Sequence, residues 1–156
     1  MTEHIPAGFH SITPYFVFKD TRKAIEFYKR AFGAQEQFVM PGPDGLGVMH
    51  AQIQIGSSIL MMGDEQPQQA CKSAETAGGS PISLYLYLED VDEAFKIALE
   101  AGAEVRMPLG DMFWGDRAGT VQDPFGYNWT LATHSKDLTP EEMQEGARAF
   151  FCQNDR

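Results

Sequence analysis

The chain contains a duplicated unit. Residues 16–31 read FVFKDTRKAIEFYKRA, and residues 86–101 read LYLEDVDEAFKIALEA, so a shift of 70 positions superposes an apolar strand, an Asp and an amphipathic helix. A later pair, residues 51–62 and 120–131, follows the same shift to within one residue, and each member resembles a strand, a turn and a second strand. A duplication on this scale predicts two similar halves with a ligand cavity between them.

The first copy shows the signals of alternating strand and helix. Residues 10–18 alternate as a strand does, and Asp20 is a suitable N-cap for the helix that follows. Gly33 is placed to end that helix. Alternation over residues 49–55 and the apolar segment 59–62 then predict a β-hairpin.

The second copy repeats this order after a polar linker. Residues 82–88 alternate, Asp90 with Glu93 forms a capping box, and Gly102 ends the predicted helix. We predict one α+β domain: two βαβββ repeats forming a curved eight-stranded mixed sheet around a cleft, with the helices on its convex face. The expected parts are repeat one (about 8–65), a linker (about 64–80), repeat two (about 81–135) and a C-terminal helix (about 139–151).

Composition narrows the classes of partner. The 156 residues can bury the core of one domain, and the net charge of −10 disfavours nucleic acid and anionic membranes. The N-terminus shows no export signal and no apolar run could span a bilayer. Two distant cysteines, Cys71 and Cys152, indicate free thiols, so a cytoplasmic protein is expected.

Four segments together resemble one family. They are FYKRAFGA (27–34), MHAQIQIGSSILMMGDE (49–65), FWGDRAGTVQDPFGYNWTLATH (113–134) and DLTPEEM (137–143). In this order and spacing the chain resembles the vicinal oxygen chelate superfamily of glyoxalases, bleomycin-resistance proteins and dioxygenases, and within it the PhnB-like branch. The resemblance implies the fold above, a ligand cleft and pairing of subunits.

Metal-dependent members of that superfamily carry one ligand on each of four strands. The matching positions here are Thr13, Met61, Ser83 and Thr130. Hydroxyls and a thioether are poor ligands for a hard divalent metal, so no metal and no other cofactor is expected. The alternative is that His10, His50 and His134 converge on a metal; otherwise they are ordinary strand histidines.

Strand alternation predicts a polar and aromatic concave face. Either a ligand meets this face, or it is a solvated groove or a dimer contact. The predicted ligand-binding residues on it are Thr13, Tyr15, His50, Gln52, Met61, Ser83, Tyr85 and Thr130.

The loop 113–119 adds candidates of several kinds. Phe113 and Trp114 can stack on a ligand, although Trp114 can equally fill the core. Arg117 can pair with an anionic group, or Asp116 can hold Arg117 within the loop. His50 and Asp116 are weak candidates for a catalytic acid–base pair.

Two functional classes follow from these patterns. The first is a metal-free homodimeric protein that binds a small aromatic or amphipathic molecule. The second is a metal-dependent lyase, isomerase or dioxygenase of the glyoxalase type, which needs ligands that the four positions do not supply. The sequence has no basic cluster that would bind a phosphonate substrate. It also has no glycine-rich cofactor loop of the kind that a methyltransferase needs.

Overall fold

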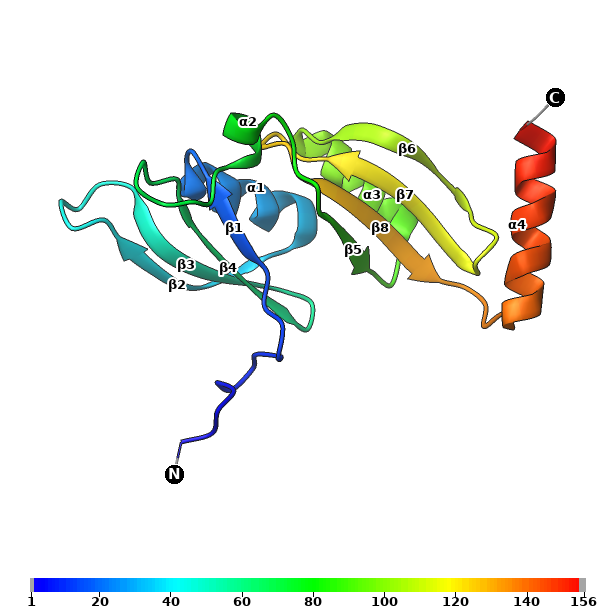
Figure 1. Ribbon diagram of the computed structural model, residues 1–156, viewed down its shortest axis with the longest axis horizontal. Helices are drawn as coiled ribbons and strands as arrows, with labels where there is room; N and C mark the ends of the chain where they lie inside the picture. Colours follow the sequence, from blue (N-terminus) through cyan, green and yellow to red (C-terminus); the bar gives the residue numbers. More distant parts are fainter. Residues whose placement is uncertain (1, 155–156) are drawn as a thin grey trace.

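The computed structural model describes residues 2–154 and contains both predicted βαβββ repeats (Figure 1). A short helix joins the repeats, and a longer one follows them. The elements in chain order are β1 (Tyr15–Phe18), α1 (Thr21–Phe32), β2 (Gln35–Pro41), β3 (Val48–Ile55), β4 (Ser58–Asp64), α2 (Ala74–Ala77), β5 (Ser83–Tyr87), α3 (Val91–Ala101), β6 (Glu104–Asp111), β7 (Asp116–Gln122), β8 (Asn128–His134) and α4 (Pro140–Asn154).

The eight strands form two mixed four-stranded sheets of the same topology. Their orders are β1-β4-β3-β2 and β5-β8-β7-β6. In each repeat the first strand runs parallel to the last, and the other pairs are antiparallel. The predicted repeat architecture is therefore confirmed, with its eight strands divided between two hydrogen-bonded sheets that lie side by side (Figure 1).

The two long helices begin and end as the sequence predicts. Asp20 accepts a hydrogen bond from Lys23 N, and Asp90 accepts one from Glu93 N, both at 3.1 Å. Gly33 (φ 64°) and Gly102 (φ 118°) end the helices in the left-handed conformation that glycine adopts readily. These local signals explain why the duplicated segments form helices.

The last strand of each repeat also holds the start of its helix. Asp64 at the end of β4 accepts a hydrogen bond from Thr21 N at 2.8 Å, and Thr133 on β8 accepts one from Val91 N at 3.0 Å. These bonds satisfy backbone donors that the first turn of a helix leaves free. The last strand and the helix of each repeat are thereby joined.

One aromatic core joins the two repeats. Phe16 on β1 stacks on Trp129 of β8 at 5.9 Å, and α1 packs against α3. The buried Asp123 accepts hydrogen bonds from Tyr28 of α1 at 2.6 Å and from Trp129 at 3.0 Å. Asp123 therefore does more than form the predicted turn: it ties repeat one to repeat two.

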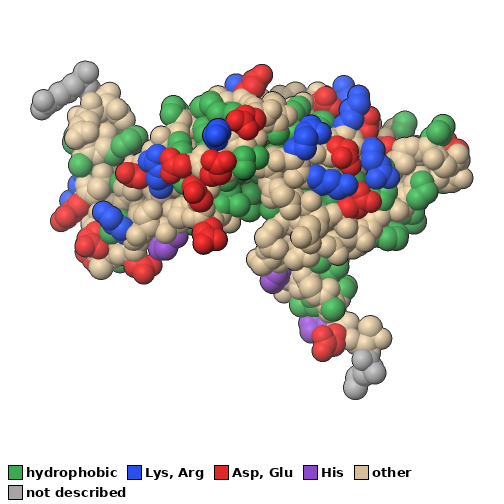
Figure 2. Space-filling view, turned by 180° about the vertical axis from the view of Figure 1, so that it is seen from behind, with side chains coloured by type: hydrophobic (Ala, Val, Ile, Leu, Met, Phe, Trp, Pro, Cys, Tyr) green, Lys and Arg blue, Asp and Glu red, His purple; other side chains and the backbone are tan. Residues whose placement is uncertain are grey.

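The sheets bury one face and leave the other open. The predicted apolar face is buried under the helices, as Phe18, Ile53 and Leu131 illustrate. Tyr15, Tyr85 and Tyr87 are exposed on the opposite side. Behind the sheets, acidic and basic side chains are interspersed over both repeats (Figure 2).

The chain ends differ from the core repeats. β1 is shorter than the predicted strand over residues 10–18, and the segment before it extends away from the body (Figure 1). α4 stands at the far end of the second sheet and buries none of its residues. Within residues 2–154, no helix combines the length and apolar character needed to cross a membrane.

Candidate functional site

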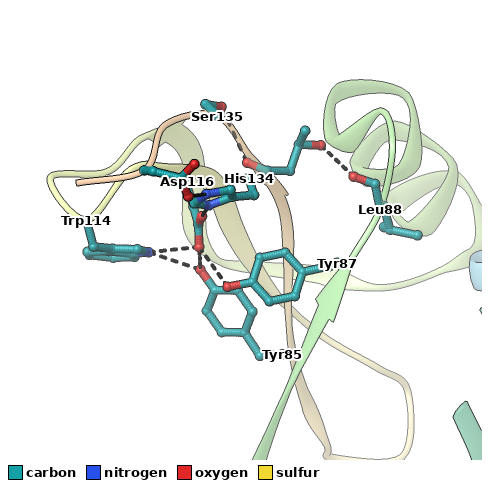
Figure 3. A network of polar contacts seen from close by, with 9 residues as sticks. Tyr85, Tyr87, Leu88, Trp114, Asp116, His134 and Ser135 are labelled. Carbon is teal, nitrogen blue, oxygen red and sulfur yellow. Dashed lines mark hydrogen bonds and ion pairs between the residues drawn. The ribbon is translucent and has the colours of Figure 1, made fainter. Parts of the chain in front are cut away.

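A buried carboxylate organises three aromatic side chains on the open side of the second sheet (Figure 3). Asp116 Oδ2 accepts hydrogen bonds from Tyr85 Oη at 2.8 Å, Tyr87 Oη at 3.2 Å and Trp114 Nε1 at 3.2 Å. The Trp114 N–H is shared with Tyr85 Oη at 3.1 Å. We call Tyr85, Tyr87 and Trp114 the aromatic platform.

The local sequence explains why these side chains meet. Tyr85 and Tyr87 are two residues apart on β5, so they lie on the same face of the sheet. Asp116 begins β7, directly after the turn that carries Trp114. That turn requires Gly115, since φ is 97° and a Cβ there would lie 2.2 Å from the Lys136 carbonyl oxygen.

The other carboxylate oxygen of Asp116 is bound by a histidine. His134 on β8 lies opposite Asp116 in the β7–β8 ladder, and its Nδ1 is 2.8 Å from Asp116 Oδ1. His134 Nε2 is 2.9 Å from Asp137 Oδ1. The imidazole is therefore held between two carboxylates.

The hydrogen bonds determine the charge states. Hydrogen bonds to Asp116 and Asp137 raise the pKa of His134, which favours the imidazolium with both nitrogens donating. Burial alone would raise the pKa of Asp116, but hydrogen bonds from His134, Tyr85 and Tyr87 outweigh it, so that pKa is lowered. Burial, with Asp116 nearby, raises the pKa of Tyr85 to about 12.

These charge states decide what the cluster can do. The ionised Asp116 already accepts four hydrogen bonds and has a low pKa, so it is a weak general base. Both ring nitrogens of His134 are directed at carboxylates, at 2.8 and 2.9 Å, so neither is open to a metal ion. The arrangement fixes aromatic rings in place and leaves Tyr85 and Tyr87 half-exposed.

The first sheet has a smaller counterpart of this cluster. Tyr15, which corresponds to Tyr85 by the 70-residue shift, has its hydroxyl 3.4 Å from His50 Nδ1. His50 Nε2 is 3.2 Å from Gln52 Nε2, and the Phe38 ring lies 6.3 Å from the imidazole. His50 thus has partners on its own sheet, and the predicted His50–Asp116 pair is not formed within the chain; Asp116 pairs with His134.

Arg117 forms ion pairs with two neighbouring carboxylates. Its guanidinium binds Asp92 of α3 bidentately at 2.8 and 2.7 Å and reaches Asp111 at 3.3 Å. These bonds raise the pKa of Arg117. The structure thus corrects two expectations: Asp116 does not hold Arg117, and Arg117 is not free for an anionic ligand.

The loop aromatics both stay outside the core. Trp114 is partly exposed and joins the platform, so it does not fill the core. Phe113 packs edge-on against Trp114 at 5.0 Å and contacts Phe150 of α4 at 5.7 Å. Aromatic surface therefore continues from the platform to the C-terminal helix.

Three of the four positions of the family's metal ligands lie on strands of the two sheets, and Thr13 precedes β1. Met61 lies opposite Tyr15, Ser83 opposite Asn128, and Thr130 opposite Tyr85. The Thr130 hydroxyl is also bonded to Thr120 at 2.8 Å. Hydroxyls and a thioether do not fit a divalent metal, and residues 2–154 contain no group of three or more His, Cys, Asp or Glu arranged to hold one.

A cavity lies at the seam between the sheets, next to Tyr85. Its volume is about 240 Å³, and both repeats contribute to its mainly apolar lining. Thr13, predicted as a ligand-binding residue, lines it beside Tyr85, and His10 lies there rather than near His50 or His134. The cavity and the platform share Tyr85, while Leu84 and Leu86 of the cavity lining lie on the other face of β5, toward the core.

The Asp116–His134 pair was missed by sequence reasoning, although a signal for it exists. The two residues are equidistant from Phe125, the middle of the five-residue connection 123–127 that contains the predicted DPFG turn. In an antiparallel hairpin such positions lie opposite each other. Symmetry about the turn therefore identifies His134 as the partner of Asp116.

Comparison with known proteins places this fold and cleft in a family. Residues 8–131 match the Glyoxalase/Bleomycin resistance protein/Dioxygenase superfamily, and the chain belongs to it. An uncharacterized protein of Mycobacterium bovis, Mb0911c, is 39% identical over 137 residues, which cover 86% of this chain and 90% of that protein.

Solved structures show the same fold. TioX from Micromonospora sp. ML1 is 25% identical with a TM-score of 0.63, over 83% of this chain and 100% of that one. The Arabidopsis thaliana product At5g48480 is 26% identical with a TM-score of 0.64, over 80% and 98% of the chains. A Bacillus cereus PhnB protein, 19% identical with a TM-score of 0.63 over 80% and 99%, shares the fold.

Proposed function

We propose that this protein binds a small aromatic or amphipathic molecule at the aromatic platform and the adjoining cavity. One observation carries the proposal: a single buried carboxylate fixes three aromatic side chains on an open sheet face. Exposed aromatic side chains that a network holds in place offer a preformed surface for a flat ligand.

Preorganisation is the physical basis of this proposal. A ligand that stacks on rings already held in place does not have to order them on binding. Each aromatic contact contributes roughly 0.5–1.5 kcal/mol beyond the area it buries. The neighbouring cavity of about 240 Å³ gives an apolar group of the same ligand a place next to Tyr85.

The alternative of a metal-dependent lyase, isomerase or dioxygenase finds less support. It requires metal ligands at positions 13, 61, 83 and 130, where the side chains are Thr, Met, Ser and Thr. It also requires a general base, and Asp116 is already saturated by donors. The binding proposal requires neither.

We also propose that two copies pair through their open sheet faces. Each face exposes large apolar side chains, including Tyr15, Phe38 and Met40 on the first sheet and Tyr85 and Tyr87 on the second. Exposed apolar surface of this kind marks interaction sites on soluble proteins. Pairing would give each platform a second wall and close the cleft.

The test uses 3-tert-butylphenol, a neutral amphipathic aromatic, and the two indole N–H resonances of the protein. Trp114 lies on the platform, whereas Trp129 is buried, bonded to Asp123 and part of the cavity lining. Binding should shift the Trp114 resonance in a saturable way, and a shift of Trp129 would report an apolar group that enters the cavity.

Two variants complete the test. Tyr87→Ala removes one platform ring and should weaken binding about 3- to 10-fold, while Ile97→Ala on α3 removes an exposed apolar group elsewhere and should not. An unchanged Trp114 resonance at millimolar 3-tert-butylphenol would refute the proposal.

A further inference from the structure

We infer that the platform selects organic cations: an aromatic or amphipathic molecule that carries a quaternary ammonium or a protonated amine. This inference rests on the proposed function and specifies the charge of the ligand. Three independent features of the site support it, namely the electronic state of the rings, the local balance of charge and the access to the ring faces.

The first feature is that all three rings donate to the same anion. The hydroxyls of Tyr85 and Tyr87 and the indole N–H of Trp114 point at Asp116 Oδ2 (Figure 3). Donation of a proton toward a carboxylate polarises the bonded group and increases the electron density of its ring. Cation–π attraction depends on that electron density, so these hydrogen bonds strengthen the binding of a cation to the rings.

The second feature is that two cations beside Asp116 are each held by two carboxylates. His134 lies between Asp116 and Asp137, and Arg117 binds Asp92 and Asp111. With every group ionised, each of these trios carries a net charge of −1.

The charge around the platform therefore stays negative. The exposed Lys136, which lines a shallow pocket with Asp116, offsets only one of the two negative charges. The net charge of −10 on the whole chain adds a long-range attraction for cations.

The third feature is that ring surface is free to receive a cation. Tyr85 and Tyr87 are 45% and 60% exposed. Their centroids lie 5.1 Å apart with the planes tilted by 45°, so the rings form an open corner. A cation in that corner could lie within about 6 Å of both centroids, the range of the cation–π interaction. The guanidinium of Arg117, the residue next to Asp116 on β7, is on the helix side of the sheet, where it binds Asp92 of α3.

The experiment compares two ligands of the same shape. 3-Hydroxyphenyltrimethylammonium carries N⁺ where 3-tert-butylphenol carries a carbon atom, and both are titrated by following the Trp114 indole resonance. At 0.15 M salt we expect the cation to bind about tenfold more tightly. The preference should persist at 0.5 M salt, because contact with the rings is screened less than long-range attraction is.

Matched variants assign the preference to the platform. Asp116→Asn removes the charge at the centre of the network and should reduce the preference to about threefold or less. Glu100→Gln removes an equal charge from the end of α3 and should leave the preference unchanged. Tyr85→Phe keeps the ring but removes its donation to Asp116, so the ratio should fall even if Asp116→Asn perturbs the loop.

The outcomes separate this inference from the proposed function. Equal binding of the two ligands would overturn the cation preference and leave the aromatic site standing. A preference that disappears at 0.5 M salt, or falls equally in Glu100→Gln, would overturn it by showing general attraction to an acidic protein. If neither ligand shifts Trp114, the binding proposal and the cation preference both fail.

Discussion

Asp116 and Asp123 are both buried, and their pKa values move in opposite directions. Burial raises the pKa of Asp123, because its donors, Tyr28, Trp129 and two backbone amides, are all neutral. Asp116 has the His134 imidazolium as an additional partner, and its pKa is lowered. The presence of a cationic partner, His134, therefore distinguishes Asp116, the carboxylate of the site, from Asp123, the carboxylate of the core.

Tyr28→Phe tests the role of Asp123 in joining the repeats. The change removes a 2.6 Å hydrogen bond to a buried carboxylate and should cost about 1.5–3 kcal/mol of unfolding free energy, measured with urea. Tyr127→Phe removes a bond to the neutral Val17 carbonyl and should cost about 1 kcal/mol. Asp123 does not anchor the interface if the Tyr127 variant is the less stable of the two.

His134 should titrate above its ordinary value of about 6.5. Hydrogen bonds to Asp116 and Asp137 raise its pKa in the folded state. Its stabilising contribution is therefore complete below about pH 6.5 and is lost as the pH rises through the folded-state pKa. The chemical shift of the imidazole Cε1 proton measures this midpoint.

Two companion observations complete the pH prediction. Asp137→Asn removes the carboxylate whose hydrogen bond raises the pKa of His134 less. The titration midpoint of His134 should fall, while Asp116 still keeps this midpoint above about 6.5. At the acid end, the lowered pKa of Asp116 means that its contribution is present above about pH 3.9 and is lost as the pH falls through the folded-state pKa. A wild-type midpoint at or below 6.5 would show that the two carboxylates do not hold the imidazolium.

At the scale of elements, the sequence predicts what local chemistry determines. Alternation, Asp20, Asp90 and the closing glycines identify both repeats, because caps and side-chain periodicity act within a few residues. The relation of β1 to β5 depends instead on how α1 packs against α3, a contact with no local signature. The expectation of one continuous sheet was therefore less accurate than the prediction of its parts.

The same distinction between local and long-range determinants applies to the candidate site. Periodicity placed Tyr85 on the open face, and the Trp114 loop was identified by composition. The bond of Asp116 to His134 and that of Arg117 to Asp92 were not among the alternatives considered, since ion pairs depend on which elements become neighbours. Strand register, once known, places His134 beside Asp116 directly.

α4 is the element least coupled to the fold. None of its residues is buried, and Gly146 lies against Phe113, where an added Cβ would lie 3.0 Å from the Phe113 Cβ. Ending the chain after Leu138 should therefore change the unfolding free energy of the repeats by less than about 1 kcal/mol. Urea unfolding measures this, and a loss of several kcal/mol would mean that α4 is part of the core.

At the scale of the whole molecule, each open sheet face carries exposed apolar side chains. Phe38 lies on the open face of the first sheet, since its strand partner is Gln52, whereas the next residue, Val39, pairs with the buried Ala51. Phe38 is 48% exposed, and Tyr87 on the second sheet is 60% exposed. In the pairing that we propose, a second copy would cover both faces with one symmetric contact.

This pairing predicts a particle of twice the chain mass in light scattering. Phe38→Lys should raise the dimer dissociation constant more than tenfold, because a charge would then be buried between apolar faces. Ile97→Lys adds the same charge on the helix side and should leave the dimer intact. The exposed Phe150 of α4 offers a rival contact. If Phe150→Lys dissociates the dimer and Phe38→Lys does not, the interface lies at the C-terminal helix, and the platform faces solvent rather than a second subunit.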